Sequence, residues 1–379
     1  MVTKAKIVVI GGSNPNTLGL LRSLGYSGYS VELLLTRPNL KGASIRFSRY
    51  AGKIHCLPAG KSIVQMLKET YANESTPPIL LHGSDSIAGQ LDDAYEELNG
   101  LFRFFNASGR SRFFLDKSNT FPLAKASGLD IIKTWRMKDI DAIPSDVEYP
   151  VLLKGNNSLD FNKGDIVICR DEDELKRRFV RGRDLLIQEY IENGCELDLA
   201  GISINHGRKV MCPVVVRKLR NSLQSTADYV KIEPVEDYPM VDVSVVSDFL
   251  KRIGYEGLFS LDLISRGRKC YFLEINLRHG ANGCLYTAAK VNFPAMWVKY
   301  CSGEDVVLTS PRTPQYLMDF NDFRNIGTKV GFWRWLWQCA NADVHFVANW
   351  KDPLPALYEF SAKIIRTIKR FLGLMPKVG

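Results

Sequence analysis

The chain has 379 residues, enough for two or three domains, and 45% of them are hydrophobic, as in an ordinary globular protein, which excludes a disordered chain. The net charge of +9 favours an anionic partner, but the basic residues are dispersed among 41 acidic ones. No aromatic-interleaved basic stripe of the nucleic-acid type is present, so nucleotides, acidic metabolites or an anionic membrane fit the charge better.

The eight cysteines stand singly, without the paired spacing of a zinc site or a disulfide framework. The first residues lack the pattern of a signal peptide, and no run of eighteen apolar residues occurs. We therefore expect a protein of the reducing cytoplasm that is neither secreted nor membrane-spanning.

The first 115 residues alternate between predicted strands and helices. An apolar run at Lys6–Ile10 leads into a turn, Thr17–Leu24 has helical spacing, and strands are predicted at Ser30–Leu35 and Ile79–His82. This order predicts a Rossmann-like α/β domain over residues 1–115. The glycine pair after the first strand lacks the Gly-x-Gly-x-x-Gly spacing, so it indicates only a tight turn at a helix N-terminus, near an anionic substrate.

A second region, residues 116–305, mixes strands with helices and polar loops. A helix is predicted to open at Lys117, and a strand at Val151–Lys154 leaves its lysine at the edge of a polar loop. The other predicted elements are a helix at Asp171–Phe179, strands at Leu185–Ile191, Leu197–Ile204 and Val210–Arg217, a flexible polar stretch, and a helix at Val245–Ile253.

The most informative segment closes this region. Two apolar runs, Leu258–Ile264 and Cys270–Asn276, are separated by a Ser-Arg-Gly-Arg turn signal and predict a hairpin. Because side chains alternate faces along a strand, Glu274 shares a face with Asn276. Asp262 joins that face only if the connecting loop has an odd number of residues, whereas an even loop would remove it.

These side chains suit a nucleotide-phosphate site. Asp262 and Glu274 lie between apolar neighbours, and buried carboxylates require a cation. Together with Asn276 they offer the hard oxygen ligands that Mg²⁺ prefers, and Arg278 adds a planar cation two residues on. The competing interpretation is an ordinary surface hairpin with solvent-facing polar residues.

The ordered set of motifs resembles the ATP-grasp superfamily of carboxylate–amine ligases over about residues 1–305. The likeness is closest to D-aspartate ligases and related amino-acid ligases in the segment from Glu274 to Pro294. The resemblance rests on Lys117, Lys154, the strand Ile187–Ile191, Glu196, Arg217, Asp262, Glu274, Asn276 and Arg278.

The resemblance implies an α/β grasp fold over residues 116–305 behind a pre-ATP-grasp domain, with ATP and Mg²⁺ or Mn²⁺ as cofactors. It implies metal binding by Asp262, Glu274 and Asn276. It places Arg217 and Arg278 at the transferred phosphate as catalytic cations. The nucleotide would be bound by Lys117 and Lys154 at the phosphates, by the backbone of Gln188, Glu189, Tyr190 and Ile191 at adenine, and by Glu196 at the ribose.

Two departures from the family pattern are visible. The loop expected to cover the phosphates, residues 155–164, is rich in asparagine instead of glycine, so Asn and Ser donors and Lys163 would have to serve there. Leu277 stands where a proline is often found, although every ligand side chain is retained.

The implied reaction joins a small-molecule carboxylate to an amine through an acyl phosphate, with an amino acid and an amine of a cell-envelope or glycan precursor as preferred substrates. No side-chain nucleophile is needed, which agrees with the absence of a Ser-His-Asp or Cys-His pattern. His279 could act as a base for the amine, but a structural role is the preferred interpretation. The alternatives are a non-catalytic ATP-binding regulatory module and an ATP-grasp carboxylase.

Residues 306–379 form a C-terminal extension of different character, rich in tryptophan and proline. Its last part, Ala356–Leu374, places apolar residues on one face of a helix and basic residues largely elsewhere. Such a helix either docks on the body of the protein or makes peripheral contact with an anionic membrane. The sequence carries no signal for an oligomeric state.

Overall fold

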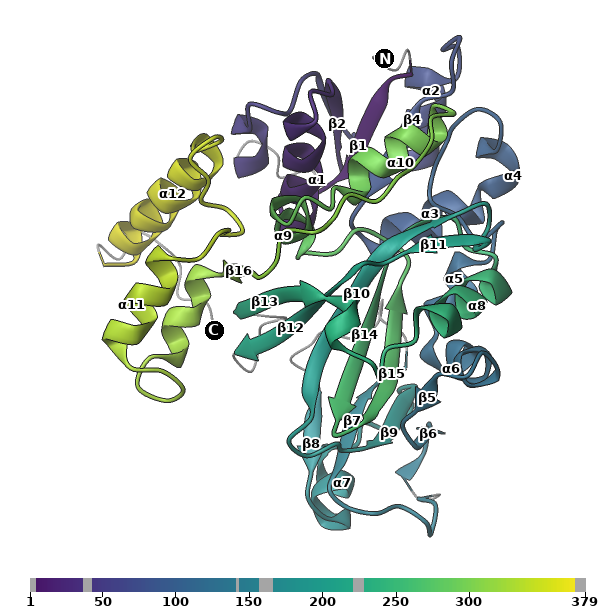
Figure 1. Cartoon of the computed structure of the whole chain (residues 1–379), viewed down its shortest axis with the longest axis vertical. Helices are drawn as coiled ribbons and strands as arrows, with labels where there is room; N and C mark the ends of the chain where they lie inside the picture. Colours follow the sequence, from purple (N-terminus) through teal and green to yellow (C-terminus); the bar gives the residue numbers. More distant parts are fainter. Residues whose placement is uncertain (1–4, 37–42, 141–142, 157–165, 221–227, 372–379) are drawn as a thin grey trace.

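The computed structural model describes residues 5–36, 43–140, 143–156, 166–220 and 228–371. It contains three β-sheets with helices around them (Figure 1). The strands and helices form a mixed α/β protein. None of the described helices is long and apolar enough to cross a bilayer.

The N-terminal sheet is parallel, with strand order β3-β2-β1-β4. Its first helix starts where Asn14 accepts the Thr17 N–H at 3.0 Å and Pro15 occupies the first turn, the usual chemistry of a helix start. The elements of this part are β1 (Ile7–Gly11), α1 (Pro15–Tyr26), β2 (Val31–Leu35), η2 (Ser44–Phe47), β3 (Ile54–Cys56), α2 (Ile63–Tyr71), β4 (Ile79–His82), α3 (Asp85–Asp93), α4 (Tyr95–Leu98) and α5 (Ser111–Phe114).

A small antiparallel sheet with order β6-β9-β7-β8 follows. It packs its own core, which includes Met137, Leu153 and Ile187. Its elements are β6 (Thr134–Met137), β7 (Val151–Gly155), β8 (Val167–Cys169), α7 (Glu172–Arg178) and β9 (Leu185–Glu189). Strands β6 and β8 were not among the predicted elements.

The large sheet has the order β16-β13-β12-β10-β14-β15-β5, with β11 paired to β10. Phe272 on β15 packs against Phe121 of α6 and Phe249 of α8, so these two helices cover one face. The elements are α6 (Lys117–Ala126), β5 (Asp130–Ile131), β10 (Cys195–Ile204), β11 (Lys209–Met211), β12 (Val214–Arg220), β13 (Tyr229–Pro234), η5 (Val235–Asp237), α8 (Val243–Ile253), β14 (Gly257–Arg266), β15 (Lys269–Asn276), α9 (Gly283–Ala288) and α10 (Phe293–Cys301).

Two sequence expectations about this sheet are wrong. The single strand predicted at Val210–Arg217 is two strands, β11 and β12, separated around Pro213, which has no N–H for a ladder. The stretch expected to be flexible and polar contains β13, because Val230 and Ile232 supply alternating buried side chains.

The C-terminal extension is joined to the body more closely than a separate segment would be. Its strand β16 (Gln315–Met318) pairs antiparallel with β13 and so extends the large sheet. The rest of the extension consists of η6 (Phe320–Asn325), α11 (Phe332–Ala340) and α12 (Leu354–Phe371).

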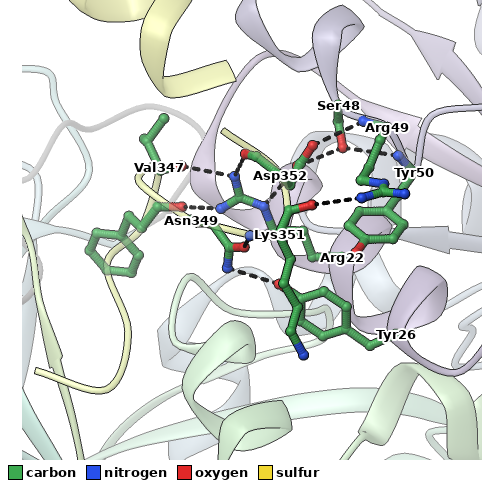
Figure 2. Close-up of polar contacts among 10 residues, drawn as sticks. Arg22, Tyr26, Ser48, Arg49, Tyr50, Val347, Asn349, Lys351 and Asp352 are labelled. Carbon is green, nitrogen blue, oxygen red and sulfur yellow. Dashed lines mark hydrogen bonds and ion pairs between the residues drawn. The ribbon is translucent and has the colours of Figure 1, made fainter. Parts of the chain in front are cut away.

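A buried ion pair fastens the extension to the N-terminal sheet (Figure 2). Arg22 of α1 and Asp352 are 2% and 1% exposed, and Nε of Arg22 lies 3.0 Å from Oδ2 of Asp352. The guanidinium also donates to the carbonyls of Phe346 and Val347, while Asp352 accepts from the Ser48 hydroxyl. The docked part of the extension is therefore the loop before α12 and the start of that helix.

Candidate functional site

The β14–β15 hairpin brings Asp262 opposite Glu274 by a route that the sequence did not reveal. Arg266 pairs with Lys269, so the connecting loop has two residues, an even number. In that register Asp262 would face Leu273. Strand β15 contains a β-bulge at Leu273. Leu263 pairs with Phe272 and Asp262 pairs with Glu274, so Leu273 is left unpaired and the register shifts by one residue. The expectation that an even loop would remove Asp262 from the site is wrong for this reason.

Three oxygen-bearing side chains converge at this point. Asp262 and Glu274 are cross-strand neighbours, and Nδ2 of Asn276 lies 3.4 Å from Oδ2 of Asp262. Within the part of the chain that the structure describes, no three His, Cys, Asp or Glu side chains form a group that could hold a metal ion. Two carboxylates and one amide instead fit a Mg²⁺ ion that brings its own phosphate oxygens and water, the usual way in which this ion is held.

Two lysines from different elements face the same carboxylates. Nζ of Lys117, at the first turn of α6, lies 3.1 Å from Oε2 of Glu274. Lys154 projects from β7 of the small sheet, where its ammonium donates to Oε1 of Gln188 at 2.8 Å. Burial is the main reason that the pKa of Lys154 is lowered to about 8; Glu274 opposes this shift and the charge of Lys117 adds to it. The charge of Lys154 on the small sheet therefore interacts with the carboxylates of the large sheet.

On the large sheet, the cation that faces Asp262 is Lys218. Asp198 pairs with both Asp262 and Val216, so Lys218, two residues beyond Val216, lies on the same face. Nζ of Lys218 lies 2.5 Å from Oε2 of Glu196. Burial disfavours the charged ammonium, but Asp262 and Glu196 outweigh it and raise the pKa of Lys218.

Arg217 does not join this cluster. It pairs with Leu197 and so lies on the opposite face of the sheet, where Nε donates to Oε2 of Glu233 at 3.0 Å. Burial lowers the pKa of Arg217 and the nearby Glu233 carboxylate raises it to a net value above the ordinary one. The predicted place of Arg217 beside the metal ligands is thus taken by its neighbour Lys218.

The segment expected to meet adenine links the small sheet to the large one. Strand β9 ends at Glu189, and the chain turns through Tyr190 and Ile191 before β10 begins. The N–H groups of Glu189 and Tyr190 donate to the carbonyls of Lys133 and Pro150. Gln188 is fully buried, and its side chain bridges Lys154 and Thr134 at 2.8 Å each. Its role in the structure is therefore to hold Lys154 in place.

Arg278 connects the site with the N-terminal sheet. Its Nε donates to Oδ1 of Asp85 at 2.8 Å, at the start of α3, and its Nη2 donates to Oδ1 of Asn276 at 2.9 Å. Burial lowers the pKa of Arg278, but Asp85 raises it to a net value above the ordinary one. Arg278, which was predicted to bind a carboxylate or phosphate, thus binds the carboxylate of Asp85 in this structure.

The carboxyl ends of β1 and β4 meet the site at this arginine. Nδ2 of Asn16 donates to the Gly83 carbonyl at 2.7 Å and to the His279 carbonyl at 3.5 Å. The His279 N–H donates to the His82 carbonyl at 3.3 Å. In open α/β sheets, ligands bind in the crevice outside the carboxyl ends of the strands, and here that edge lies against the Asp262–Glu274 cluster.

His279 is a core residue. Its side chain is 4% exposed, and burial lowers its pKa to about 3, with a further contribution from Arg278. A neutral imidazole with so low a pKa is a poor base at neutral pH. The structural interpretation of His279 therefore fits better than a role in proton transfer.

Two residues of the cluster were missed by sequence reasoning. Asp198 is buried opposite Asp262, where it accepts from Ser260 at 2.6 Å and from Asn282 at 2.8 Å. Its spacing of two residues from Glu196 was a usable signal, because residues i and i+2 of a strand share a face. Lys218 had no such signal. Residues 157–164 of the loop predicted to cover the phosphates, Lys163 among them, lie outside the described residues.

Comparisons with known proteins give a consistent fold. No protein-family model and no curated protein sequence matches the chain. The biotin carboxylase domain of Hydrogenobacter thermophilus 2-oxoglutarate carboxylase, in complex with ADP, its magnesium salt and bicarbonate, has a TM-score of 0.64 at 18% identity over 82% of this chain and 73% of that one.

Two further structures are similar. An L-amino acid ligase from Bacillus licheniformis has a TM-score of 0.60 at 15% identity, with 78% of this chain and 74% of that one covered. The N5-carboxyaminoimidazole synthetase of Staphylococcus aureus has a TM-score of 0.65 at 13% identity, with 83% and 82% covered. The chain spans only 30% of another similar structure, a Rhizobium etli pyruvate carboxylase.

At these identities the likeness is one of fold, and it covers 78–83% of this chain. The arrangement of a small antiparallel sheet facing a large one, with lysines and carboxylates between them, agrees with it. The chain has the ATP-grasp fold.

Proposed function

We propose that the protein is an ATP-dependent, ADP-forming carboxylate–amine ligase that works through an acyl phosphate. The observation that carries the proposal is that Asp262, Glu274 and Asn276 of the large sheet meet Lys117 of α6 and Lys154 of the small sheet. Paired carboxylates beside lysines are what a metal-bound triphosphate requires. The fold of the neighbours supports the same chemistry.

Each side chain has a distinct task in this proposal. Asp262, Glu274 and Asn276 would hold Mg²⁺ or Mn²⁺, which when bound supplies positive charge to the β- and γ-phosphates. Lys117 and Lys154 would hold phosphate oxygens, and Lys218 takes the position first predicted for Arg217. The transferred phosphate turns the carboxylate oxygen into a good leaving group, after which the amine attacks the acyl carbon and phosphate departs.

The nucleoside would lie along the link between the two sheets. Because the N–H groups of Glu189 and Tyr190 are engaged, the Glu189 carbonyl and the Ile191 N–H are the backbone groups proposed for adenine. Glu196 is proposed for the ribose hydroxyls, where it would exchange part of its contact with Lys218 for the sugar.

The carboxylate substrate would enter at the carboxyl ends of β1 and β4. Arg278 lies at that edge with Asp85 as its partner, so we propose that a substrate carboxylate competes with Asp85 for the guanidinium. An amino acid and an amine of a cell-envelope or glycan precursor are the proposed substrates, and the excess of basic residues favours anionic ones. We propose the cytoplasm as the compartment of the reaction.

The regions 1–115, 116–305 and 306–379 are proposed as the substrate-binding, nucleotide-binding and C-terminal parts. Strand β16 of the third part pairs with β13 of the second, so the third part would not be removable as a unit.

The proposal is tested by ADP release with Mg-ATP across D- and L-amino acids, with and without hydroxylamine, which traps an acyl phosphate as a hydroxamate. We expect hydroxamate with at least one acid, and none from a Glu274→Gln variant. A panel that yields neither ADP nor hydroxamate, from a protein that binds Mg-ATP, would favour the non-catalytic module.

A carboxylase is the second candidate, because two of the similar structures are a biotin carboxylase domain and a pyruvate carboxylase. Bicarbonate is then the carboxylate, and carboxyphosphate is the intermediate. An arm of the same assay with bicarbonate and free biotin separates the two: bicarbonate-dependent ADP release without amino-acid-dependent release would replace the ligase with the carboxylase.

Lys154 predicts a pH dependence of nucleotide binding. Its pKa of about 8 means that the free protein loses this charge as the pH rises above 8, whereas bound phosphates favour the protonated form. Below about pH 7 the lysine is protonated in both states and the affinity for Mg-ADP should not change through this group. Above about pH 8 the affinity should fall, by up to about tenfold per pH unit. Calorimetry over roughly pH 6.5 to 9.5 measures this change in affinity, and Lys154→Met should bind Mg-ADP weakly and lose the dependence on pH.

Lys218 and Arg217 form a matched pair of adjacent cations on opposite faces. Lys218→Met should lower kcat/KM by about 10- to 100-fold, because a charge-assisted contact with the phosphates is lost. Arg217→Met should change kcat/KM by no more than about threefold, since this side chain contacts Glu233. Steady-state kinetics on the two variants decides the assignment, and the reverse order of effects would restore Arg217 to the site.

A further inference from the structure

Helix α11 turns its apolar face away from the protein. Its exposed large side chains follow helical spacing on one side, and the residues of intermediate exposure lie on the other. No residue of this helix is buried. Amphipathic helices of globular proteins normally turn the apolar stripe inward, so this orientation requires a partner. The exposed side chains are Phe332 at 50%, Trp333 at 79%, Leu336 at 43% and Trp337 at 66%.

Helix α12 repeats the pattern. Its first turns are held on the N-terminal part, where Glu359 accepts from the Ser44 hydroxyl at 2.8 Å and Tyr358 stacks on Phe47 at 4.8 Å. Four large apolar side chains of this helix are nevertheless open to solvent. They are Leu357 at 60%, Ile364 at 59%, Ile365 at 52% and Ile368 at 51% exposure.

These eight side chains, together with the 99% exposed Trp350, are here called the outward apolar face. Both helices lie at one edge of the molecule, away from strands β14 and β15 (Figure 1). We propose that the outward apolar face binds the surface of a membrane that contains anionic lipids.

The composition of the face fits the interfacial layer of a bilayer. Four of the six tryptophans of the chain lie between residues 333 and 350. Tryptophan is enriched at the level of the lipid headgroups, where its ring is apolar and its N–H remains near water. A helix such as α12, with isoleucines on one side and lysines beside them, lies in the plane of that layer.

Charge selects anionic lipid as the partner. The sequence after residue 305 holds ten lysines and arginines against five acidic residues. Two of those five, Asp322 and Asp352, are buried and paired with Arg220 and Arg22, so they do not face a partner. From residue 354 onward the sequence has five basic residues and one acidic residue, Glu359. Polybasic segments beside an apolar face are attracted to anionic headgroups.

The same charge disfavours a second copy of the chain as the occupant. Two outward apolar faces in contact would bring two basic segments together, and like charges across an interface cost affinity. The outward apolar face contains no residue of the nucleotide site, so membrane binding is independent of the proposed function.

The test is co-sedimentation of the full chain with two kinds of vesicle, one of phosphatidylcholine and one of phosphatidylcholine with phosphatidylglycerol. We expect binding to the anionic vesicles and at least about tenfold weaker binding to the neutral ones. The double variants Trp333→Ser/Trp337→Ser and Ile364→Ser/Ile368→Ser should each bind anionic vesicles about tenfold or more weakly. These side chains are exposed, so the unfolding midpoint should remain that of the wild type.

The matched control is Phe113→Ser/Val180→Ser, which removes two apolar side chains that are 54% and 50% exposed outside the extension. It should bind vesicles like the wild type. Wild-type protein that ignores anionic vesicles would overturn the proposal, as would equal binding by all three variants. Sedimentation velocity without lipid tests whether a second copy of the chain occupies the face. A wild-type dimer that the serine substitutions dissociate, in a protein that does not bind vesicles, would assign the face to a second copy.

Discussion

A Glu274→Gln variant is expected to lose turnover by about a thousandfold or more, equivalent to about 4 kcal/mol of transition-state stabilisation. Glu274 faces Asp262 across the hairpin and lies 3.1 Å from the ammonium of Lys117, so one change would weaken both the proposed metal site and the position of the lysine proposed for the phosphates. The glutamine side chain keeps the shape but not the charge. Hydroxamate formation and ADP release measure the effect.

The stability of this variant separates a catalytic role from a structural one. Removing Glu274 leaves Lys117 and Lys154 without the carboxylate that offsets their repulsion, but it also relieves the repulsion between Glu274 and Asp262, so we expect the unfolding midpoint to move little. Glu236→Gln is the control, an exposed carboxylate beyond β13, and should keep full activity. Retention of wild-type hydroxamate formation by Glu274→Gln would contradict the assignment of the metal site.

The second large effect is expected on stability, at the buried pair of Figure 2. Arg22→Met should lower the free energy of unfolding by about 3–5 kcal/mol, because Asp352 is left as an uncompensated buried charge. The change also removes the donors that reach the Phe346 and Val347 carbonyls. Urea unfolding followed by tryptophan fluorescence suits the measurement, since four tryptophans lie in the extension that this pair holds.

Two further variants show whether burial is the reason. Arg22→Met/Asp352→Leu should recover part of the loss, because no unpaired charge remains, although the carbonyls stay without their donor. Arg112→Met removes the exposed pair with Asp93, whose side chains are 51% and 44% exposed, and should cost less than about 1 kcal/mol. Equal losses for Arg22→Met and Arg112→Met would show that the buried pair does not anchor the extension.

The sequence predicted the elements that depend on local patterns. The hairpin, its three oxygen-bearing side chains and the lysines at 117 and 154 were predicted from alternation, from turn residues and from the order of motifs, and the structure brings them together. The bulge at Leu273 could not be predicted, because the loop fixes the pairing only of the residues next to it. The site depends on that one unpaired residue.

The remaining differences arise from contacts between distant parts of the chain. Arg217 and Lys218 are neighbours, and only the pairing of β12 with β10 decides which of them faces Asp262. Arg22 and Asp352 are 330 positions apart and carry no local signal of their pairing. The same holds for Arg278 and Asp85, 193 positions apart, which fix the N-terminal sheet against the site.

The most direct test of the account is transfer of oxygen from the carboxylate substrate to phosphate. The carboxylate identified by the hydroxamate assay is labelled with ¹⁸O, and the phosphate released with Mg-ATP and the amine is analysed by ³¹P NMR or mass spectrometry. Activation as an acyl phosphate predicts phosphate that carries one ¹⁸O atom from the carboxylate. Phosphate free of the label, which acquires ¹⁸O only when the water is labelled, would mean that ATP is simply hydrolysed and would contradict the ligase mechanism.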